Sequence, residues 1–471
     1  MAQPKKVHFI GICGVGTGAL AVAFKRAGWI VTGSDKGFYP PVSTALIEAG
    51  VSYYPGWHPE NIGAPDIVIA GGIGTSPSNP EILYVKEKKI PLLSFAEAIG
   101  EYLVKKHSIV CVGTWGKTTT SALLSFIFEK AGMDPSYFSG GVAIGRDAGL
   151  ITASDWSIVE GDEYKSAIWD NQAKFFYYKP TDILMTAISW DHADLYPTEK
   201  NYIDAFEKLL KTIPAGGKIV VCADNENAIR ITGKSAPITY GKSLSADYRY
   251  ENISHTKSGL SFNIVYHGKT YQIKSPMLGA YNAENIAGCF AMAKEQGIAP
   301  GTITDAIAEF KGLKRRLEKR YESADGHITI IDAHAPTPEK ARNGIESLRE
   351  VYKGKIVAIF EPNIGGRQRA SSAMYDGAFS SADTVFIPRL TKLKIDETAT
   401  EKPLEGDELA DIIKKTQPHV QYVEDDELLV DSAIRYAKDL HDDNVIVFLG
   451  SHGFRGMIEE TIKRLAEDKT L

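Results

Sequence analysis

The sequence predicts an α/β protein of 471 residues with three successive domains. Short apolar runs of strand length alternate with helix-length segments in three separate stretches, and the basic run Lys311–Arg316 separates the second stretch from the third. We therefore expect a Rossmann-like domain over residues 1–107, a central P-loop NTPase-like domain with a small antiparallel sheet over 108–316, and a Rossmann-like domain over 317–471.

The first domain begins with a strand, a glycine-rich turn and a helix, and an acidic residue follows its second strand. The turn contains Gly11, Gly14 and Gly16, and the second strand ends at Ser34 and Asp35. This order is typical of a βαβ unit that binds a phosphate group, although a purely structural turn has the same pattern. The glycines are spaced three and two residues apart, the reverse of the NAD-binding pattern, so we expect a different phosphate-bearing ligand.

A second phosphate-binding pattern organises the central domain. A buried strand is expected over Ser108–Val112, a glycine turn over Gly113–Gly116, and a helix from Thr119 to Gly132. Amides at a helix start bind phosphate, the lysine after the turn neutralises β- and γ-phosphate charge, and the next threonine can ligate Mg²⁺. The alternative is an ordinary turn with a surface lysine. The residues that we expect to bind a nucleotide here are Gly113, Thr114, Gly116, Lys117, Thr118 and Thr119.

Two further strands of the central domain end in groups that can hold a metal ion. Glu160 ends one of them, and Asp191 and His192 follow the other. The carboxyl ends of parallel strands meet at one edge of a sheet, so these groups are expected near the phosphate loop. A carboxylate suits Mg²⁺ well, whereas histidine is a less usual ligand of this ion, and a structural role is the alternative for His192.

The end of the central domain contains three strand-like runs and a polar helix. Residues 246–254, 260–266 and 270–273 surround turn signals, which predicts the small antiparallel sheet. A helix follows, with Asn282 and Asn285 on one face. Capping of the helix is the alternative to ligand binding for these two side chains.

Polar, glycine-rich loops follow the predicted strands of the third domain. Strands are expected near residues 327–331, 355–360, 384–387 and 445–449. The loops after them leave room for a ligand, and ordinary connections between strands and helices are the alternative. The polar residues of these loops that we consider as ligand contacts are Asp332, His334, Arg367, His452 and Arg455.

Composition and charge favour an ordinary globular enzyme. Hydrophobic residues make up 44% of the chain and charged residues 24%, and the net charge of −6 argues against a partner that is a nucleic acid or a membrane surface. The four cysteines are scattered without a CxxC pair, which indicates neither a zinc site nor a disulfide framework. No apolar run reaches membrane-spanning length and no signal-peptide pattern is present, so we expect a cytoplasmic location.

Five short stretches, taken together, indicate a protein family more specifically than any one of them does. They are Gly113-Thr-Trp-Gly-Lys-Thr-Thr-Thr120, Glu160-Gly-Asp-Glu163, Asp191-His192, Tyr281-Asn-Ala-Glu-Asn285 and Gly312-Leu-Lys-Arg-Arg-Leu-Glu318. Together and in this order they resemble the Mur ligase family, the ATP-dependent amide-forming enzymes of peptidoglycan assembly. The likeness extends into the loops of the third domain, so it covers nearly the whole chain.

The resemblance implies a function for each domain. The first domain would bind the UDP part of UDP-N-acetylmuramate through Gly11, Gly14, Gly16, Ser34 and Asp35. The second would bind ATP and Mg²⁺, and the third would bind the incoming amino acid or peptide. The third-domain residues assigned to that amine substrate are His334, Arg367, His452 and Arg455.

The resemblance also implies roles for single residues. Lys117 would hold the β- and γ-phosphates of ATP, and Arg316 would contact the γ-phosphate from the domain boundary. The residues assigned to catalysis are Lys117, Arg316 and Asp332. Those assigned to Mg²⁺ are Thr118, Glu160 and His192. Besides the phosphate loop, the residues assigned to ATP are Asn282, Asn285 and Arg316.

Within the family, the segment from Glu160 to His192 favours one branch. It resembles the branch that joins the tripeptide L-alanyl-γ-D-glutamyl-meso-diaminopimelate to UDP-N-acetylmuramate, and it is longer than in the branch that adds L-alanine. Addition of L-alanine is the alternative. A non-catalytic nucleotide-binding protein and a NAD-dependent oxidoreductase are further alternatives. We expect a monomer or a homodimer.

Overall fold

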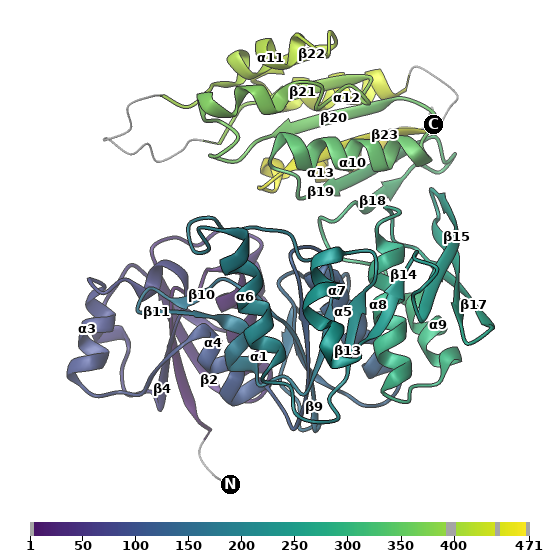
Figure 1. Cartoon of the computed structure of the whole chain (residues 1–471). Coiled ribbons are helices and arrows are strands. Elements are labelled where there is room, and N and C mark those ends of the chain that lie inside the picture. Colours follow the sequence, from purple (N-terminus) through teal and green to yellow (C-terminus); the bar gives the residue numbers. More distant parts are fainter. Residues whose placement is uncertain (1–3, 392–401, 439–442, 468–471) are drawn as a thin grey trace. The chain divides into compact units, whose positions relative to one another are not determined.

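The protein has three mostly parallel β-sheets with helices packed against them, which confirms the predicted fold class (Figure 1). The computed structural model describes residues 4–391, 402–438 and 443–467. The chain divides into two compact units: the N-terminal sheet and the central sheet belong to the first, and the C-terminal sheet belongs to the second. Within the described ranges, none of the helices is both long enough and apolar enough to span a lipid bilayer.

Five parallel strands form the N-terminal sheet, and they are β1 (Lys6–Ile10), β2 (Ile30–Asp35), β3 (Ser52–Pro55), β4 (Ile67–Ala70) and β5 (Leu92–Ser94). Their order across the sheet is β3-β2-β1-β4-β5. Parallel strands are joined by crossover connections that cover both faces of a sheet, which explains why the last four residues of β1 are all buried. The helices of this domain are α1 (Val15–Arg26), α2 (Val42–Glu48), α3 (Pro80–Glu87) and α4 (Phe95–Ala98).

Ten strands form the central sheet, and they are β6 (His107–Val112), β7 (Ser136–Phe138), β8 (Gly149–Leu150), β9 (Trp156–Glu160), β12 (Asp182–Met185), β13 (Ile219–Cys222), β14 (Ile238–Gly241), β15 (Tyr248–Thr256), β16 (Gly259–Tyr266) and β17 (Lys269–Ser275). Their order is β17-β16-β15-β14-β13-β12-β6-β9-β7-β8. Two-residue connections make β15, β16 and β17 successive hairpins. The predicted antiparallel strands therefore extend the main sheet. The helices are α5 (Lys117–Lys130), α6 (Glu199–Leu210), α7 (Glu226–Thr232), α8 (Asn282–Glu295) and α9 (Pro300–Glu309).

A short hairpin connects the central domain with the N-terminal domain. Its antiparallel strands are β10 (Lys165–Ala167) and β11 (Asp170–Ala173). The hydroxyl of Ser166 lies 2.7 Å from the hydroxyl of Ser94, and both side chains are buried. At the tip of the hairpin, the Ile168 N–H donates to Thr75 Oγ1 at 3.3 Å. The segment that follows the acidic motif 160–163 therefore contacts the N-terminal domain directly.

Six strands form the C-terminal sheet, and they are β18 (Glu318–Glu322), β19 (Ile328–Ala333), β20 (Ile356–Glu361), β21 (Thr384–Pro388), β22 (Val420–Val423) and β23 (Asn444–Gly450). Their order is β18-β19-β23-β20-β21-β22, and only β18 runs antiparallel to its neighbour. The helices are α10 (Pro338–Val351), α11 (Gly406–Lys414), α12 (Asp426–Ala437) and α13 (Met457–Glu467).

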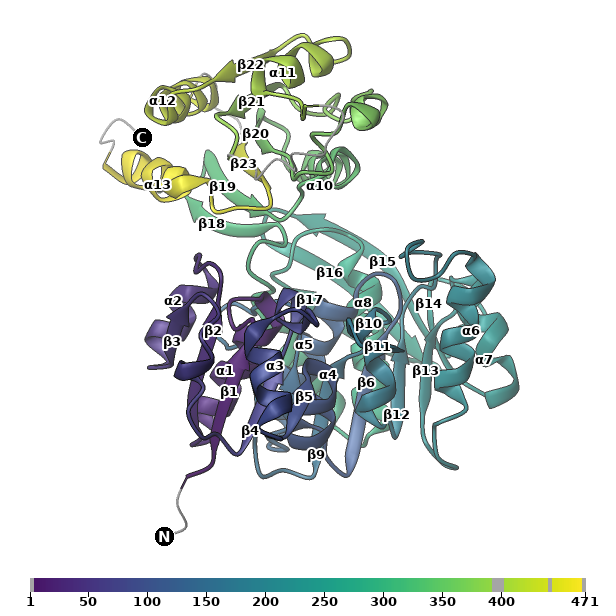
Figure 2. The ribbon, with the colours of Figure 1, turned by 90° about the vertical axis from the view of Figure 1, so that its left-hand side faces the viewer.

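Alternate residues of β20 point to the two faces of the C-terminal sheet, as the pleat of a strand requires. Ile356, Ala358 and Phe360 belong to the core that α10 and α11 cover. Val357 and Ile359 belong to the core that α12 and α13 cover on the opposite face (Figure 2). The sheet is therefore buried on both sides, and only its edges and strand ends are open to a ligand.

The ends of several elements differ from the sequence-based expectation. Helix α5 begins at Lys117, two residues before the expected start, because Gly116 turns the chain with a φ of +83°. Strand β12 ends at Met185 although the apolar run continues, since the next residue, Thr186, donates its hydroxyl to the carbonyl of Trp115 in the phosphate loop. The sequence does not predict β18, because Glu318–Glu322 is a polar strand at the edge of its sheet.

A buried histidine lies in the middle of the N-terminal sheet. His8 is fully buried in β1, and its Nδ1 lies 2.9 Å from Thr32 Oγ1. Its Nε2 has no hydrogen-bond partner among the described residues. Burial lowers the pKa of His8 to about 4, because the imidazolium ion would lose its hydration. His8 therefore stays neutral at pH values where an exposed histidine binds a proton.

We expect His8 to reduce the stability of the fold as the pH falls from 6.5 to about 4. In this range the unfolded chain binds a proton at this residue and the folded chain does not, so the free energy of unfolding falls, by about 3 kcal/mol at most. Urea unfolding at several pH values should show a smaller fall in midpoint for His8→Gln than for the wild type. His267→Gln, in an exposed turn, is the control. Identical pH dependence of wild type and His8→Gln would contradict the expectation.

Candidate active site

The loop between β6 and α5 requires glycine at two positions. Gly113 has a φ of +131° and Gly116 a φ of +83°, values that side chains disfavour. A Cβ atom on Gly116 would lie only 2.4 Å from Asn285 Oδ1. Gly116 begins α5 without a side-chain cap, so the first amides of this helix are free to bind an anion. Residues 113–119 therefore form a glycine turn with free helix amides, an arrangement that can bind phosphate, and we call them the phosphate loop.

Lys117 is held inside this loop by a buried acid. Its Nζ donates to the carbonyl of Gly113 at 2.6 Å and to Glu163 Oε2 at 2.8 Å. The side chain of Lys117 is 13% exposed and that of Glu163 is 0% exposed. A buried carboxylate and a nearly buried ammonium stabilise each other strongly because little water screens them. The ammonium is therefore fixed beside the loop amides.

A chain of buried and partly buried hydrogen bonds connects Glu163 with α6 and the phosphate loop. The Tyr202 hydroxyl donates to Glu163 Oε1 at 2.9 Å and lies 2.9 Å from Thr114 Oγ1. Thr114 in turn donates to the carbonyl of Ser189 at 2.7 Å. The Tyr196 hydroxyl donates to the main-chain carbonyl of Glu163 at 2.7 Å. The pKa of Tyr202 is raised well above its ordinary value, mainly by burial and next by the charge of the nearby Glu163 carboxylate. The hydroxyl of Tyr202 therefore keeps its proton.

The sequence does not identify Glu163 or Tyr202 as site residues. Glu163 belongs to the acidic motif 160–163, and this motif is a sequence signal that could have found it. Tyr202 reaches the loop only because α6 packs there, and no local pattern indicates this contact.

Thr118 and Glu160 lie together at the start of α5. Glu160, at the carboxyl end of β9, accepts a hydrogen bond from Thr118 Oγ1 at 3.1 Å and another from the N–H of Gly140. Burial raises the pKa of Glu160, while the Gly140 N–H and the Lys117 ammonium oppose that shift. Two of the three residues assigned to Mg²⁺ are thus direct neighbours.

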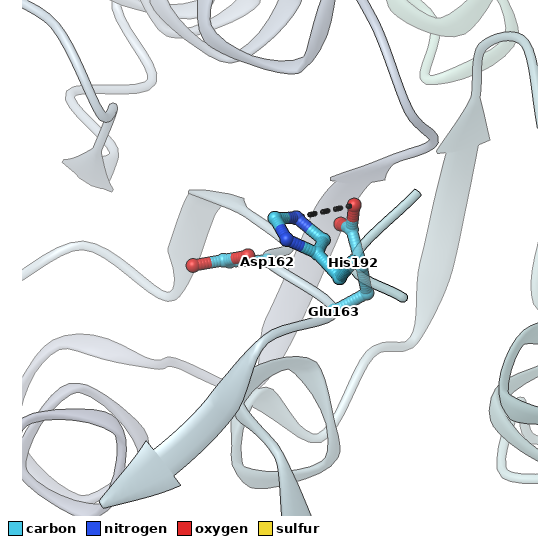
Figure 3. Close-up of side chains that lie close together, drawn as sticks. All are labelled: Asp162, Glu163 and His192. Atoms are coloured by element: carbon cyan, nitrogen blue, oxygen red, sulfur yellow. Dashed lines mark ion pairs between the residues drawn. The ribbon is translucent and has the colours of Figure 1, made fainter. Parts of the chain in front are cut away.

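His192 lies with Asp162 and Glu163. One potential ligand atom from each of these three residues lies within 4.8 Å of the other two. The His192 Nε2 is 3.7 Å from Glu163 Oε1 (Figure 3). Burial acts to raise the pKa of Asp162, but the Lys174 ammonium outweighs it, so this pKa lies below its ordinary value. The Asp162 carboxylate therefore carries a negative charge near the phosphate loop.

The donor atoms around the phosphate loop fit a hard divalent cation. Thr118 supplies a hydroxyl oxygen, and Glu160 supplies carboxylate oxygens. Mg²⁺ prefers such oxygen ligands and keeps several waters, so one or two protein oxygens suffice beside a triphosphate. The imidazole of His192 is a less usual ligand of this ion.

Two asparagines of α8 face the phosphate loop. Asn282 and Asn285 are both buried, and Asn285 Nδ2 donates to Asn282 Oδ1 at 3.0 Å. The close approach of Asn285 Oδ1 to Gly116 places this amide beside the loop. The structure therefore brings Asn282 and Asn285 close to the phosphate loop, whereas Arg316, also assigned to ATP, belongs to the C-terminal unit.

The glycine turn after β1 packs closely against its surroundings. Gly11 has a φ of +82°, and Gly14 begins α1. A Cβ atom on Gly16 would lie 3.2 Å from the ring of Phe95, so glycine allows α1 and α4 to approach. Gly11 and Gly14 therefore lie in the turn at the carboxyl end of β1, whereas Gly16, expected in the same turn, lies in the first turn of α1.

Ser34 and Asp35 bind neighbouring loops of the N-terminal domain. Asp35 Oδ2 accepts the N–H of Cys13, within the glycine turn, at 2.9 Å. The Ser34 hydroxyl donates to Glu81 Oε2 at 2.5 Å, and Glu81 also accepts the N–H of His58 at 2.8 Å. Burial raises the pKa of Glu81. The two predicted residues thus hold the shape of the turn and of the loops beside it.

In the C-terminal unit, the two residues assigned to catalysis differ in their surroundings. Arg316 is exposed, and its guanidinium has no hydrogen-bond or ion-pair partner within the part of the chain that the structure describes. Asp332 is 2% exposed and lies 3.3 Å from Arg315 Nε and 3.5 Å from Arg320 Nη1. Burial raises the pKa of Asp332, while the Arg315 charge opposes that shift. Asp332 therefore interacts with arginines inside its own unit.

Two of the four residues assigned to the amine substrate have internal partners. Arg367 is 4% exposed and donates to the carbonyls of Leu404 at 3.0 Å and Thr391 at 2.9 Å. Arg455 forms two hydrogen bonds with Asp426, both of 2.9 Å. These contacts occupy two of the five N–H donors of each guanidinium group.

The two histidines assigned to the amine substrate are more open. The pKa of His334 is lowered to about 4 by burial and by the charges of Arg315 and Arg316, so its imidazole is neutral. His452 is exposed, and its Nδ1 lies 2.9 Å from Ser451 Oγ. Both histidines belong to loops at the carboxyl ends of the strands, β19 and β23.

Comparisons with known proteins agree with the resemblance found in the sequence. Three family models match successive parts of the chain: the Mur ligase family catalytic domain over residues 6–107, the Mur ligase middle domain over 112–293, and the Mur ligase glutamate ligase domain over 315–452. The chain belongs to the Mur ligase family. It is an ATP-dependent ligase that forms a carbon–nitrogen bond in peptidoglycan synthesis, and the alternative of a NAD-dependent oxidoreductase is set aside.

The relatives include ligases of two kinds. The UDP-N-acetylmuramate–L-alanyl-gamma-D-glutamyl-meso-2,6-diaminoheptandioate ligase of Haemophilus influenzae is 32% identical over 76% of this chain and 80% of its own length. The UDP-N-acetylmuramate–L-alanine ligase of Chlorobaculum tepidum is 30% identical over 82% of this chain and 81% of its own. The solved UDP-N-acetylmuramate–alanine ligase of Thermotoga maritima has the same fold, with a TM-score of 0.78, 23% identity and 98% of both chains covered.

We expect Gly116→Ala to weaken nucleotide binding. A methyl group would meet Asn285 Oδ1 at 2.4 Å, and alanine at a φ of +83° is strained, so the loop must shift. A strain of about 1 to 2 kcal/mol corresponds to about tenfold in affinity. Calorimetric titration with MgATP measures the change. Gly301→Ala in α9, where a Cβ atom has no neighbour within 4 Å, is the control. Equal affinity of Gly116→Ala and wild type would show that the loop does not contact the nucleotide.

Proposed function

We propose that this ligase joins the amino group of a peptide to the carboxylate of UDP-N-acetylmuramate and converts ATP to ADP and phosphate. The observation that carries the proposal is the position of Lys117, whose ammonium lies 2.8 Å from buried Glu163 and beside free helix amides. A lysine fixed beside such amides, with acids at neighbouring strand ends, suits a metal-bound triphosphate. The peptide that we propose is L-alanyl-γ-D-glutamyl-meso-diaminopimelate, and L-alanine is the second candidate.

Each domain supplies one part of the reaction in this proposal. Residues 1–107 bind the UDP part of the sugar nucleotide at the turn that contains Gly11 and Gly14 and at Gly16 in the first turn of α1. Residues 108–316 bind ATP, and residues 317–471 bind the amine. We place the reaction in the cytoplasm, because ATP and UDP-linked sugars are cytoplasmic metabolites.

The proposed chemistry activates a carboxylate, which is a poor electrophile because its negative charge repels a nucleophile. A carboxylate oxygen attacks the γ-phosphorus of ATP, ADP leaves, and an acyl phosphate forms. The amine nitrogen then attacks the carbonyl carbon, and the tetrahedral intermediate expels phosphate as the nitrogen loses a proton. Lys117 and Arg316 offset the negative charge of the transferred group, and exclusion of water protects the acyl phosphate from hydrolysis.

Thr118, Glu160 and His192 are the residues that we propose to hold Mg²⁺. When bound, Mg²⁺ neutralises charge on the phosphate oxygens. Glu163 keeps the Lys117 ammonium at the loop carbonyl of Gly113, so the lysine needs little rearrangement when ATP binds.

Further residues complete the proposed substrate contacts. Asn282 and Asn285 contact ATP from α8, and Ser34 and Asp35 shape the UDP-sugar turn from the end of β2. Among the residues assigned to the amine, His334 and His452 are the better candidates for direct contact, since Arg367 and Arg455 have internal partners. We propose that Asp332 acts through the arginines it pairs with.

Two observations bear on the choice of amine. The segment between Glu160 and His192 contains the β10–β11 hairpin, and its sequence supports the tripeptide, as does the identity of 32% to the Haemophilus influenzae ligase named for that peptide. The fold supports L-alanine as the second candidate, because the Thermotoga maritima ligase named for alanine has a TM-score of 0.78.

Phosphate release distinguishes the two candidates. The protein is incubated with ATP, Mg²⁺ and UDP-N-acetylmuramate, and the tripeptide or L-alanine is added separately. Stimulation by the tripeptide alone supports the proposal, and stimulation by L-alanine alone replaces it with the second candidate. Absence of stimulation by either amine would refute both.

We expect Lys117→Ala to lower the rate of ADP formation by about a hundredfold to a thousandfold, the usual effect of losing one charge contact to the transition state. Lys130→Ala, at the other end of α5, is the matched control, since Lys130 pairs with Glu309 on the surface. Circular dichroism checks that both variants are folded. Wild-type activity in Lys117→Ala would refute the assignment of this loop to the triphosphate.

A further inference from the structure

Two adjacent arginines at the start of the C-terminal unit have opposite surroundings. Arg316 is exposed, and its guanidinium has no hydrogen-bond or ion-pair partner over the described ranges. The guanidinium of Arg315 forms hydrogen bonds with four acceptors. The acceptors are the carbonyl of Ser451 at 2.8 Å, that of Gly450 at 2.8 Å, that of His452 at 2.9 Å and Asp332 Oδ1 at 3.3 Å. We call these five residues the Arg315 cluster.

The main chain around Arg316 is fixed on both sides. Arg315 and Leu317 have φ values of +59° and +51°, which are unfavourable for residues with side chains and persist only where the surroundings impose them. The Arg315 N–H donates to Glu318 Oε2 at 2.9 Å, and its carbonyl accepts the N–H of His334 at 2.6 Å. Leu317 is buried in the core beneath α10. The main chain of residues 315–317 is therefore fixed, while the side chain of Arg316 has no partner among the described residues.

The Arg315 cluster lies where a parallel sheet offers a ligand site. Asp332 belongs to the carboxyl end of β19, and the residues 450–452 follow from the end of β23, the strand paired with β19. Ligands of open α/β sheets bind at the carboxyl ends of the strands. Arg315 therefore connects the segment that carries Arg316 with the loop that carries His452.

We propose that Arg315 is a positioning residue of the ligase reaction: by binding the carbonyls of residues 450–452 and the carboxylate of Asp332, it holds Arg316 and this loop in the places they need for phosphoryl transfer. This inference rests on the proposed function. Arginine suits the task because its planar group directs five N–H donors to several acceptors at once, whereas lysine offers a single point of charge on a flexible stem.

The same unit contains a matched control. Arg349, in α10, donates to the carbonyls of Ser381 at 3.2 Å and Gly354 at 2.6 Å and also pairs with Asp383. These groups precede β20 and β21, so they lie at the amino ends of the strands, away from the ligand edge of the sheet. Arg349 resembles Arg315 in the kind of hydrogen bonds it forms, but it lies at the opposite end of the strands.

The test compares Arg315→Lys, Arg316→Lys, the double variant and Arg349→Lys. We expect Arg315→Lys to lower kcat for amine-dependent ADP formation by about tenfold to a hundredfold, as a small misplacement of a reacting group does. Because Arg315 acts partly through Arg316, the double variant should lose less kcat than the product of the two single losses. Arg349→Lys should keep the wild-type kcat.

Hydrogen exchange of the full chain supplies a readout that does not depend on activity. The amides of residues 450–453 should exchange faster in Arg315→Lys than in the wild type, and they should be unchanged in Arg349→Lys. Arg315→Gln, which keeps an amide donor group without the charge, replaces the lysine variant if that variant does not fold.

Several results would overturn the inference. They are a wild-type kcat in Arg315→Lys, independent effects of the two substitutions in the double variant, or an equal loss of kcat in Arg349→Lys. If the wild type responds to no amine, the proposed function fails, and hydrogen exchange alone decides whether Arg315 holds the loop. Unchanged exchange of residues 450–453 in Arg315→Lys would then refute its positioning role.

Discussion

The buried contact between Lys117 and Glu163 is the interaction on which the rest of the site depends. Moving a lysine and a carboxylate out of water costs free energy, and their attraction offsets that cost only while both are present. Glu163 also accepts a hydrogen bond from Tyr202, and Tyr202 lies against Thr114 in the phosphate loop. The lysine is therefore held directly by the phosphate loop and Glu163 and indirectly by Tyr202 of α6, and its ammonium has a defined place beside the loop amides.

In each of the three sheets, polar groups gather at the carboxyl ends of the parallel strands. All such ends meet at one edge, so loops from separate strands bring their polar groups together there. Many of these groups hold the loops and do not face a ligand: Asp35 accepts the N–H of Cys13, and Arg367 donates to the carbonyl of Leu404. Internal contacts of this kind fix the loops and leave a few residues, such as Arg316, available for substrate.

In the proposed function, the C-terminal unit determines which amine the enzyme uses. An enzyme separates two substrates by the contacts that only one of them makes in the transition state. The loops after β19 and β23 carry His334 and His452, and the Arg315 cluster defines how these loops are held. Under our proposal, Arg315 touches no substrate but affects both the phosphoryl transfer and the place of the amine.

The sequence by itself determined the fold class, the order of the sheets and the phosphate loop, because apolar periodicity and a glycine turn before Lys117 are local patterns. It did not indicate the polar edge strand β18, because Glu318–Glu322 lacks a run of apolar residues. The tertiary structure alone decided that Glu163 binds Lys117, that Tyr202 reaches Thr114, and that Arg315 binds the carbonyl of Gly450. The partners in these pairs are 46, 88 and 135 residues apart. Such contacts arise only when separate strands and helices pack together, and no short stretch of sequence encodes them.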